Sequence, residues 1–166
     1  MGTSAYLALG SNLGDRLATL QRAAGLLDAR AGIRVVRSSR VYETAPVGPP
    51  QPAYLNAVIE VATDLEPRAL LEACLGVEAE LGRERLERWG PRTLDVDVLT
   101  YDELELREPG LEIPHPRMHE RGFVLVPLGE LTPEPMLPGG RTFGQLRLEP
   151  EAVLGVRVFA PPLRVP

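Results

Sequence analysis

Hydrophobic and polar positions follow each other along the chain in segments that predict a definite order of strands and helices. Alternating or continuous apolar residues between turn signals predict four strands, at residues 5–11, 33–44, 53–63 and 93–101. Apolar residues at helical spacing predict helices over 15–30 and 66–85, the second with Pro67 in its first turn. A short helical segment limited by prolines is expected over 121–131.

The predicted order β-α-β-β-α-β indicates an α+β fold of the ferredoxin-like kind, an antiparallel sheet with helices packed on one face. A length of 166 residues favours a single domain, spanning residues 1–166. The last twenty residues are rich in proline, and we expect them to form an extended C-terminal extension packed on the body. This fold hosts many unrelated functions, so function has to be argued from sites.

Each predicted helix has an apolar face that should lie on the sheet. In the first helix this face carries Leu17, Leu20, Ala24 and Leu27. In the second it carries Leu70, Cys74, Val77 and Leu81. The single cysteine is therefore expected to pack in the core.

Charge and composition exclude several classes of function. A net charge of −5 and a pI of about 5.2 argue against a nucleic-acid-binding surface. No apolar run is long enough to span a membrane and no signal peptide is visible, which predicts a cytoplasmic protein without a membrane partner. All 18 basic residues are arginine. A phosphate-binding loop with an essential lysine is thereby excluded, and any phosphate clamp must use arginine.

Two carboxylates interrupt the last predicted strand, in the sequence RWGPRTLDVDVLTYD. Asp95 and Asp97 must share one face of this strand, while Val96 and Val98 face the core. Carboxylates this close repel each other, and a divalent cation such as Mg²⁺ would relieve the repulsion. The alternative is an exposed strand face whose acids pair with nearby arginines. The flanking arginines and Trp89 favour the metal site.

Four segments resemble one enzyme family, 6-hydroxymethyl-7,8-dihydropterin pyrophosphokinase. The RWGPRTLDVDVLTYD segment is similar to the family's signature, and AYLALGSNLGDR is similar to its first strand and turn. SSRVYETAPVGPPQPAYLNAVIEVAT resembles its substrate loop and following strand, and IPHPRMHERGFVLVPLGEL a late segment. The resemblance runs in unbroken order over roughly residues 5–135.

The resemblance implies transfer of pyrophosphate from ATP to the hydroxymethyl group of the pterin, with release of AMP. It implies that Asp95 and Asp97 hold two Mg²⁺ ions, and that Arg83 and Arg92 contact the phosphates. Metals in such sites orient the reactants and neutralise charge. Arg85 and Trp89 match a loop that closes over the site; for Trp89 a buried structural role is the alternative.

The resemblance also implies a pocket for the pterin. Tyr54 and Phe123 match its stacking pair, and Asn56 can offer donor and acceptor to the amide-like edge of the ring. Core packing for Phe123 and a strand-end hydrogen bond for Asn56 are the alternatives. Further contacts to the pterin are implied for Thr44, Ala45 and Val47.

For ATP, the resemblance implies contacts from Glu78, His115 and Arg121 beside Arg83, Arg85 and Arg92. Structural roles are the alternatives for Glu78 and His115. Gly110, Glu112 and Pro116 depart from residues found in some family members, which concerns the contacts to adenine and ribose. The sequence GSNLGDR is interpreted as a capped strand-to-helix turn that does not touch phosphates.

Two other classes of function fit parts of the pattern. A nucleotidyltransferase or nuclease can present paired aspartates on the same kind of sheet, but the low pI disfavours its basic track. A non-catalytic binding module of this fold has no need of two aspartates and several arginines together. We expect a monomer whose partners are the small molecules ATP and 6-hydroxymethyl-7,8-dihydropterin.

Overall fold

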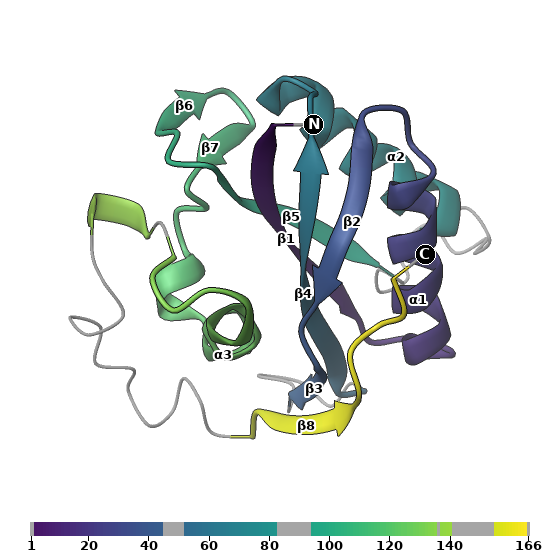
Figure 1. Cartoon of the computed structure of the whole chain (residues 1–166). Coiled ribbons are helices and arrows are strands. Elements are labelled where there is room, and N and C mark those ends of the chain that lie inside the picture. Colours follow the sequence, from purple (N-terminus) through teal and green to yellow (C-terminus); the bar gives the residue numbers. More distant parts are fainter. Residues whose placement is uncertain (1, 45–51, 83–93, 136, 141–154, 166) are drawn as a thin grey trace.

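The computed structural model describes residues 2–44, 52–82, 94–135, 137–140 and 155–165. Its main sheet is antiparallel throughout, with strands in the order β5-β1-β4-β3-β8 and β2 also paired to β4 (Figure 1). The strands are β1 (Thr3–Ser11), β2 (Ile33–Ser38), β3 (Val41–Thr44), β4 (Tyr54–Thr63), β5 (Asp95–Tyr101) and β8 (Arg157–Ala160). Each of the seven strand and helix ranges predicted from the sequence overlaps a described element of the same type. The predicted fold class is confirmed.

Side-chain alternation divides the residues of the central strands between two cores. Leu7 on β1, Ile59 on β4 and Val96 on β5 face helices α1 (Arg16–Asp28) and α2 (Pro67–Gly82), which cover one face of the sheet. Helix α3 (Gly122–Leu131) lies on the opposite face, where it packs with Val58 and Leu99 (Figure 1). The two predicted helices thus share one face, as expected, and the third covers part of the other.

Helix α2 follows the prediction closely, and α1 differs from it at one position. All four predicted core residues of α2 are buried. In α1, Leu17 was expected in the core but is 37% exposed, so that expectation is wrong. Leu17 lies in the first turn beside the C-terminal residues 160–164 and not over the sheet, and Ala23 is buried in its stead.

The predicted strand 33–44 is two strands, β2 and β3, separated at Ser39 and Arg40. Both strands pair with β4. At the break, the Ser39 backbone N–H donates to the carbonyl oxygen of Val58 (2.8 Å), and the Ser39 hydroxyl accepts from the Val58 N–H (2.9 Å). The hydroxyl replaces a backbone carbonyl in the ladder, which ends β2 without releasing β4.

In two segments, the one after β5 and the C-terminal extension, the sequence pattern did not predict individual strands. After β5 the chain forms a small hairpin of β6 (Leu106–Glu108) and β7 (Leu111–Ile113), with Gly110 at a φ of 76° in its turn. The C-terminal extension is tied down as expected, because β8 adds to the edge of the main sheet beside β3. Short 3-10 turns lie at η1 (Met118–Glu120) and η2 (Pro138–Gly140).

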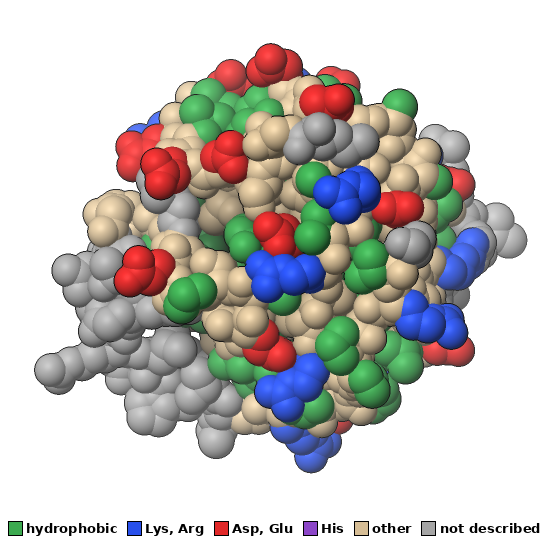
Figure 2. Space-filling view, viewed as in Figure 1, with side chains coloured by type: hydrophobic (Ala, Val, Ile, Leu, Met, Phe, Trp, Pro, Cys, Tyr) green, Lys and Arg blue, Asp and Glu red, His purple; other side chains and the backbone are tan. Residues whose placement is uncertain are grey.

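On the face shown in Figure 2, arginine and carboxylate side chains lie interspersed with apolar ones. Among the described helices, none is long and apolar enough to cross a bilayer.

Candidate active site

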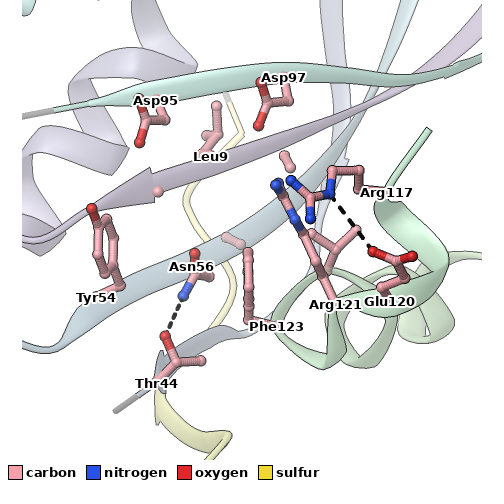
Figure 3. Close-up of a pocket in the computed structure, with 14 residues that line it drawn as sticks. Leu9, Thr44, Tyr54, Asn56, Asp95, Asp97, Arg117, Glu120, Arg121 and Phe123 are labelled. Atoms are coloured by element: carbon pink, nitrogen blue, oxygen red, sulfur yellow. Dashed lines mark hydrogen bonds and ion pairs between the residues drawn. The ribbon is translucent and has the colours of Figure 1, made fainter. Parts of the chain in front are cut away.

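A cavity of about 650 Å³ lies between the sheet face opposite α1 and α2 and the η1–α3 segment. The sheet supplies its floor and one wall, and η1 and α3 supply the other wall (Figure 3). The lining residues are Ala8, Leu9, Gly10, Thr44, Tyr54, Asn56, Ala57, Asp95, Asp97, Arg117, Glu120, Arg121, Phe123 and Val124.

The two aspartates of β5 both line this cavity, as their spacing predicts. Val96 between them is buried in the core beneath α1 and α2, so the carboxylates occupy the opposite face. In the sheet register Asp95 lies across from Gly10 and Asp97 across from Ala8, both on β1. The residues beside the two carboxylates on β1 are therefore small, and both carboxylates line the cavity.

Gly10 forms the floor of the cavity between Asp95 and Asn56. It pairs with Asp95 on β5 and with Asn56 on β4. A Cβ atom at Gly10 would lie 3.1 Å from Oδ1 of Asn56 and 3.9 Å from Cδ1 of Tyr54. A side chain here would press on the amide group, so this close approach, and not a turn, favours glycine at position 10.

Asn56 is held in a defined orientation at the bottom of the cavity. Its Nδ2 donates to Oγ1 of Thr44 (2.8 Å), and the two side chains are each 7% exposed. This bond turns the amide oxygen toward Gly10 and leaves one N–H of the amide for another acceptor. Asn56 is therefore bonded to a neighbouring strand and also lines the cavity.

Two aromatic side chains flank this amide from different elements. Tyr54 stands at the start of β4, and Phe123 projects from the first turn of α3, with Asn56 between them in Figure 3. Phe123 is 36% exposed, so it is not the core residue that its sequence context allowed. Burial, and secondarily the charge of Asp95, raises the pKa of the Tyr54 hydroxyl. A flat ring between two aromatic faces above a fixed amide is a suitable arrangement for a planar heterocycle.

Positive charge enters the cavity from the η1–α3 segment. Arg117 and Arg121 extend side by side into the cavity from the wall opposite the aspartates (Figure 3). Arg121 also stacks on Phe123, with its guanidinium carbon 5.7 Å from the ring centroid. Arg117 is 69% exposed, and its ion pair with Glu120 is long, at 3.6 Å. An exposed pair of this kind contributes little to stability, so Arg117 is available to an incoming anion.

Two predicted nucleotide-site residues lie outside this lining. Glu78 on α2 accepts a hydrogen bond from the backbone N–H of Val96 (3.0 Å), and so fixes the strand between the two aspartates. His115 donates its backbone N–H to the carbonyl of Leu99 (2.9 Å), and its Nδ1 accepts from the N–H of Arg117 (3.2 Å). Burial lowers the pKa of His115, against the opposing charge of Asp97. The ring is consequently neutral at neutral pH.

The cavity brings together seven of the predicted site residues: Thr44, Tyr54, Asn56, Asp95, Asp97, Arg121 and Phe123. The expected roles of six others concern residues outside the described part of the chain: Ala45, Val47, Arg83, Arg85, Trp89 and Arg92. Sequence reasoning missed Gly10, Ala8, Arg117 and Glu120. Their signal was weak, because glycine and alanine in a strand have no side-chain chemistry, and the two charged residues lie in the short turn that follows Pro116.

The donor set at β5 suits magnesium. In the described residues no group of three or more histidine, cysteine, aspartate or glutamate side chains could hold a metal ion. Two carboxylates on one rigid strand beside an open cavity nevertheless match the needs of Mg²⁺, which completes its shell with water and substrate phosphates. A site for zinc would need more protein ligands than these.

Two carboxylates, two arginines and two aromatic rings around one cavity are side chains that suit an enzyme transferring a phosphate-containing group from a nucleotide to a heterocycle. Comparison with known proteins specifies which one. Residues 6–133 match the family model of 7,8-dihydro-6-hydroxymethylpterin-pyrophosphokinase, HPPK. The chain belongs to this family.

Curated relatives agree over most of their length. The chain is 46% identical over 154 residues to 2-amino-4-hydroxy-6-hydroxymethyldihydropteridine pyrophosphokinase of Methylorubrum extorquens, covering 91% of this chain and 97% of the relative. It is 48% identical over 132 residues to the protein with the same description from Bacillus subtilis, covering 79% of each. The chain therefore transfers pyrophosphate from ATP to 6-hydroxymethyl-7,8-dihydropterin in folate biosynthesis, as an ATP-dependent diphosphokinase.

Solved structures support the fold independently. A Plasmodium falciparum HPPK-DHPS triple mutant superimposes with a TM-score of 0.65 at 16% sequence identity. The match covers 84% of this chain and 43% of that one, so the chain spans less than half of these longer proteins. At this identity the likeness concerns the arrangement of helices and strands.

The close approach at Gly10 yields a prediction. In Gly10→Ala the new methyl group meets Oδ1 of Asn56 at 3.1 Å and must displace the amide. We expect dihydropterin to bind about 10-fold more weakly, with the KM for ATP changed less than about twofold. Fluorescence titration with the pterin and steady-state kinetics measure the two quantities.

Gly25→Ala is the matched control. Gly25 lies in α1 with nothing within 4 Å of its Cβ position, so the same methyl group should leave pterin binding unchanged. If Gly10→Ala binds the pterin with native affinity, the Asn56 amide beside Gly10 does not take part in pterin binding.

Proposed function

We propose that the pyrophosphokinase reaction takes place in the cavity between the sheet and the η1–α3 segment. The pterin ring lies between Tyr54 and Phe123, and the Asn56 amide pairs with its amide-like edge. Thr44 holds that amide in position. The support is the convergence in one cavity of an aromatic pair, an oriented amide and two carboxylates from elements far apart in the sequence.

The phosphates of ATP lie at the other end of the cavity, between the aspartates and the arginines. Asp95 and Asp97 would hold two Mg²⁺ ions, which when bound supply charge neutralisation and an acidified hydroxyl on the pterin. Arg121 and Arg117 approach from the opposite wall and bind phosphate oxygens with planar forks. The protein itself aligns the pterin hydroxyl with the phosphate. It also keeps the two aspartates and the two arginines on opposite walls, so that the phosphates can bind between them.

The remaining assignments rest on the family resemblance. Arg83 and Arg92 are proposed to contact the transferred phosphates, and Arg85 and Trp89 to cover the site. Ala45 and Val47 are proposed to complete the pterin wall. Glu78 and His115 belong to the nucleotide side; Glu78 acts there by fixing the backbone between the aspartates. A single domain over residues 1–166, a monomeric state and a cytoplasmic location stay predictions.

The carboxylate pair provides the direct test of this site. In the double variant Asp95→Asn/Asp97→Asn, the side chains keep their size and lose their charge. We expect kcat to fall by at least about 1000-fold and Mg²⁺-ATP binding to weaken strongly, because the phosphate charge is no longer compensated. Calorimetric titration and quantification of AMP measure the two effects.

Asp102→Asn is the control, since Asp102 follows the same strand outside the cavity. Its Oδ1 accepts a hydrogen bond from the Ser4 N–H (2.9 Å), which asparagine retains. Circular dichroism checks that each variant is folded. A folded double variant that still produces AMP at the native rate would refute the assignment.

Arg117 gives a second, independent prediction. Arg117→Gln should raise the KM for ATP by about 10-fold and leave dihydropterin affinity unchanged, because one charge-assisted contact to phosphate is lost. Arg30→Gln is the comparison, because Arg30 pairs with Glu80 at 3.0 Å on the α1–α2 side of the sheet. If both variants show the native KM for ATP, Arg117 does not bind phosphate.

A further inference from the structure

A cluster of charged side chains lies beside the cavity, at the end of the sheet where β3 and β8 run side by side (Figure 1). Glu43 on β3 is its centre. Its Oε2 accepts from Nη1 of Arg16 (3.0 Å), and its Oε1 accepts from Nη2 of Arg157 (2.8 Å). Each carboxylate oxygen thus has its own guanidinium, one from the first residue of α1 and one from the first residue of β8.

The pair between Arg16 and Glu43 is better enclosed than an ordinary surface ion pair. The two side chains are 22% and 16% exposed. The Arg16 guanidinium carbon also lies 5.3 Å from the centroid of the Phe159 ring on β8. The hydrogen bonds from Arg157 and then Arg16 lower the pKa of Glu43, so its carboxylate is charged at neutral pH. Contacts on several sides fix the position of the Arg16 guanidinium.

Arg16 makes one more contact, and this contact links the cluster to the cavity. The same Nη1 that binds Glu43 also donates to the backbone carbonyl oxygen of Ala53 (2.8 Å). Glu43 directly precedes Thr44, and Ala53 directly precedes Tyr54. Thr44 and Tyr54 both line the cavity and are paired in the β3–β4 register. One nitrogen atom therefore joins the two chain segments next to these cavity residues.

We propose that Arg16 is a positioning residue for the dihydropterin pocket. Through Glu43 and the Ala53 carbonyl it holds the ends of β3 and β4 together, so that the Thr44 hydroxyl orients the Asn56 amide and the Tyr54 ring keeps its place. A pocket that is ordered before the ligand arrives loses less conformational entropy on binding. This inference rests on the proposed pterin site.

The competing view treats the cluster as a stabilising contact without a role in binding. Arg68 offers a comparison, because its Nη2 also joins a carboxylate and a backbone carbonyl: Glu108 at 2.8 Å and Pro109 at 2.9 Å. Arg68 lies on α2, and neither it nor its partners line the cavity. A purely stabilising role would make the two arginines equivalent in their effect on substrate affinity.

The experiment compares Arg16→Met, Arg16→Lys and Arg68→Met in the full chain. Dihydropterin dissociation constants, kcat, the KM for ATP and thermal melting are measured for each variant. We expect Arg16→Met to bind dihydropterin about 10-fold more weakly, with the KM for ATP within about twofold of native. Arg16→Lys should restore most of the affinity, because one ammonium can reach both oxygens as the single Nη1 does. Arg68→Met should bind dihydropterin as the native enzyme does.

Two results would overturn the proposal: native dihydropterin affinity in Arg16→Met, or an equal loss in Arg68→Met. Should Arg16→Met fail to fold, Arg16→Gln carries the same expectation, since its shorter side chain cannot bridge both oxygens. Asn56→Ala separates this inference from the site on which it rests. If Asn56→Ala binds dihydropterin normally, the pocket assignment fails; if it binds weakly while the Arg16 variants bind normally, the positioning role alone fails.

Discussion

The alternation of side chains across three antiparallel strands is the constraint on which this enzyme depends. In β5, β1 and β4 alternate residues face α1 and α2, and most of them are apolar and build the larger core. The residues in between face the other way, where Val58 and Leu99 pack against α3 and others line the cavity. Asp95, Gly10 and Asn56 stand in one row on this second face, because the strand register aligns them. One face of the sheet thus carries the larger core, and the other carries both the smaller core with α3 and the cavity.

The second face is closed by a helix whose position also depends on polar contacts. Helix α3 brings Phe123 and, at its N-terminal cap, Arg121 to the cavity. At its other end, Glu130 accepts from Nε of Arg40 (3.0 Å), the residue before β3, and from the hydroxyl of Tyr42 on β3 (2.8 Å). Apolar packing against Val58 and Leu99 holds the helix between these points. These contacts hold Phe123 on the same cavity as Tyr54, although the two rings come from distant segments.

The sequence predicted the elements whose pattern is long and regular, and it failed where short-range contacts decide. Helix α2 spans several periods of its pattern, so the burial of its core face followed from spacing. Strand β4 was predicted as a strand, but it is buried on both faces, which its partial alternation did not show. Strands of three residues, such as β6 and β7, have no period to detect. The division at Ser39 depends on a hydroxyl that bonds to Val58, a partner known only from the fold. Likewise, Gly10 and Arg117 can be recognised as cavity residues only when the residues across the cavity are known. The common face of Asp95 and Asp97, in contrast, could be predicted from alternation within one strand.

We propose that Asp95 and Asp97 hold divalent metal against the phosphates of ATP on the face of the sheet opposite α1 and α2. A crystal structure with Mn²⁺ in place of Mg²⁺, a non-hydrolysable ATP analogue and dihydropterin would decide this, because anomalous scattering locates the metal. We expect manganese at about 2.1 Å from carboxylate oxygens of both aspartates, with phosphate oxygens completing the shell. Manganese bound to the phosphates away from both carboxylates would contradict it.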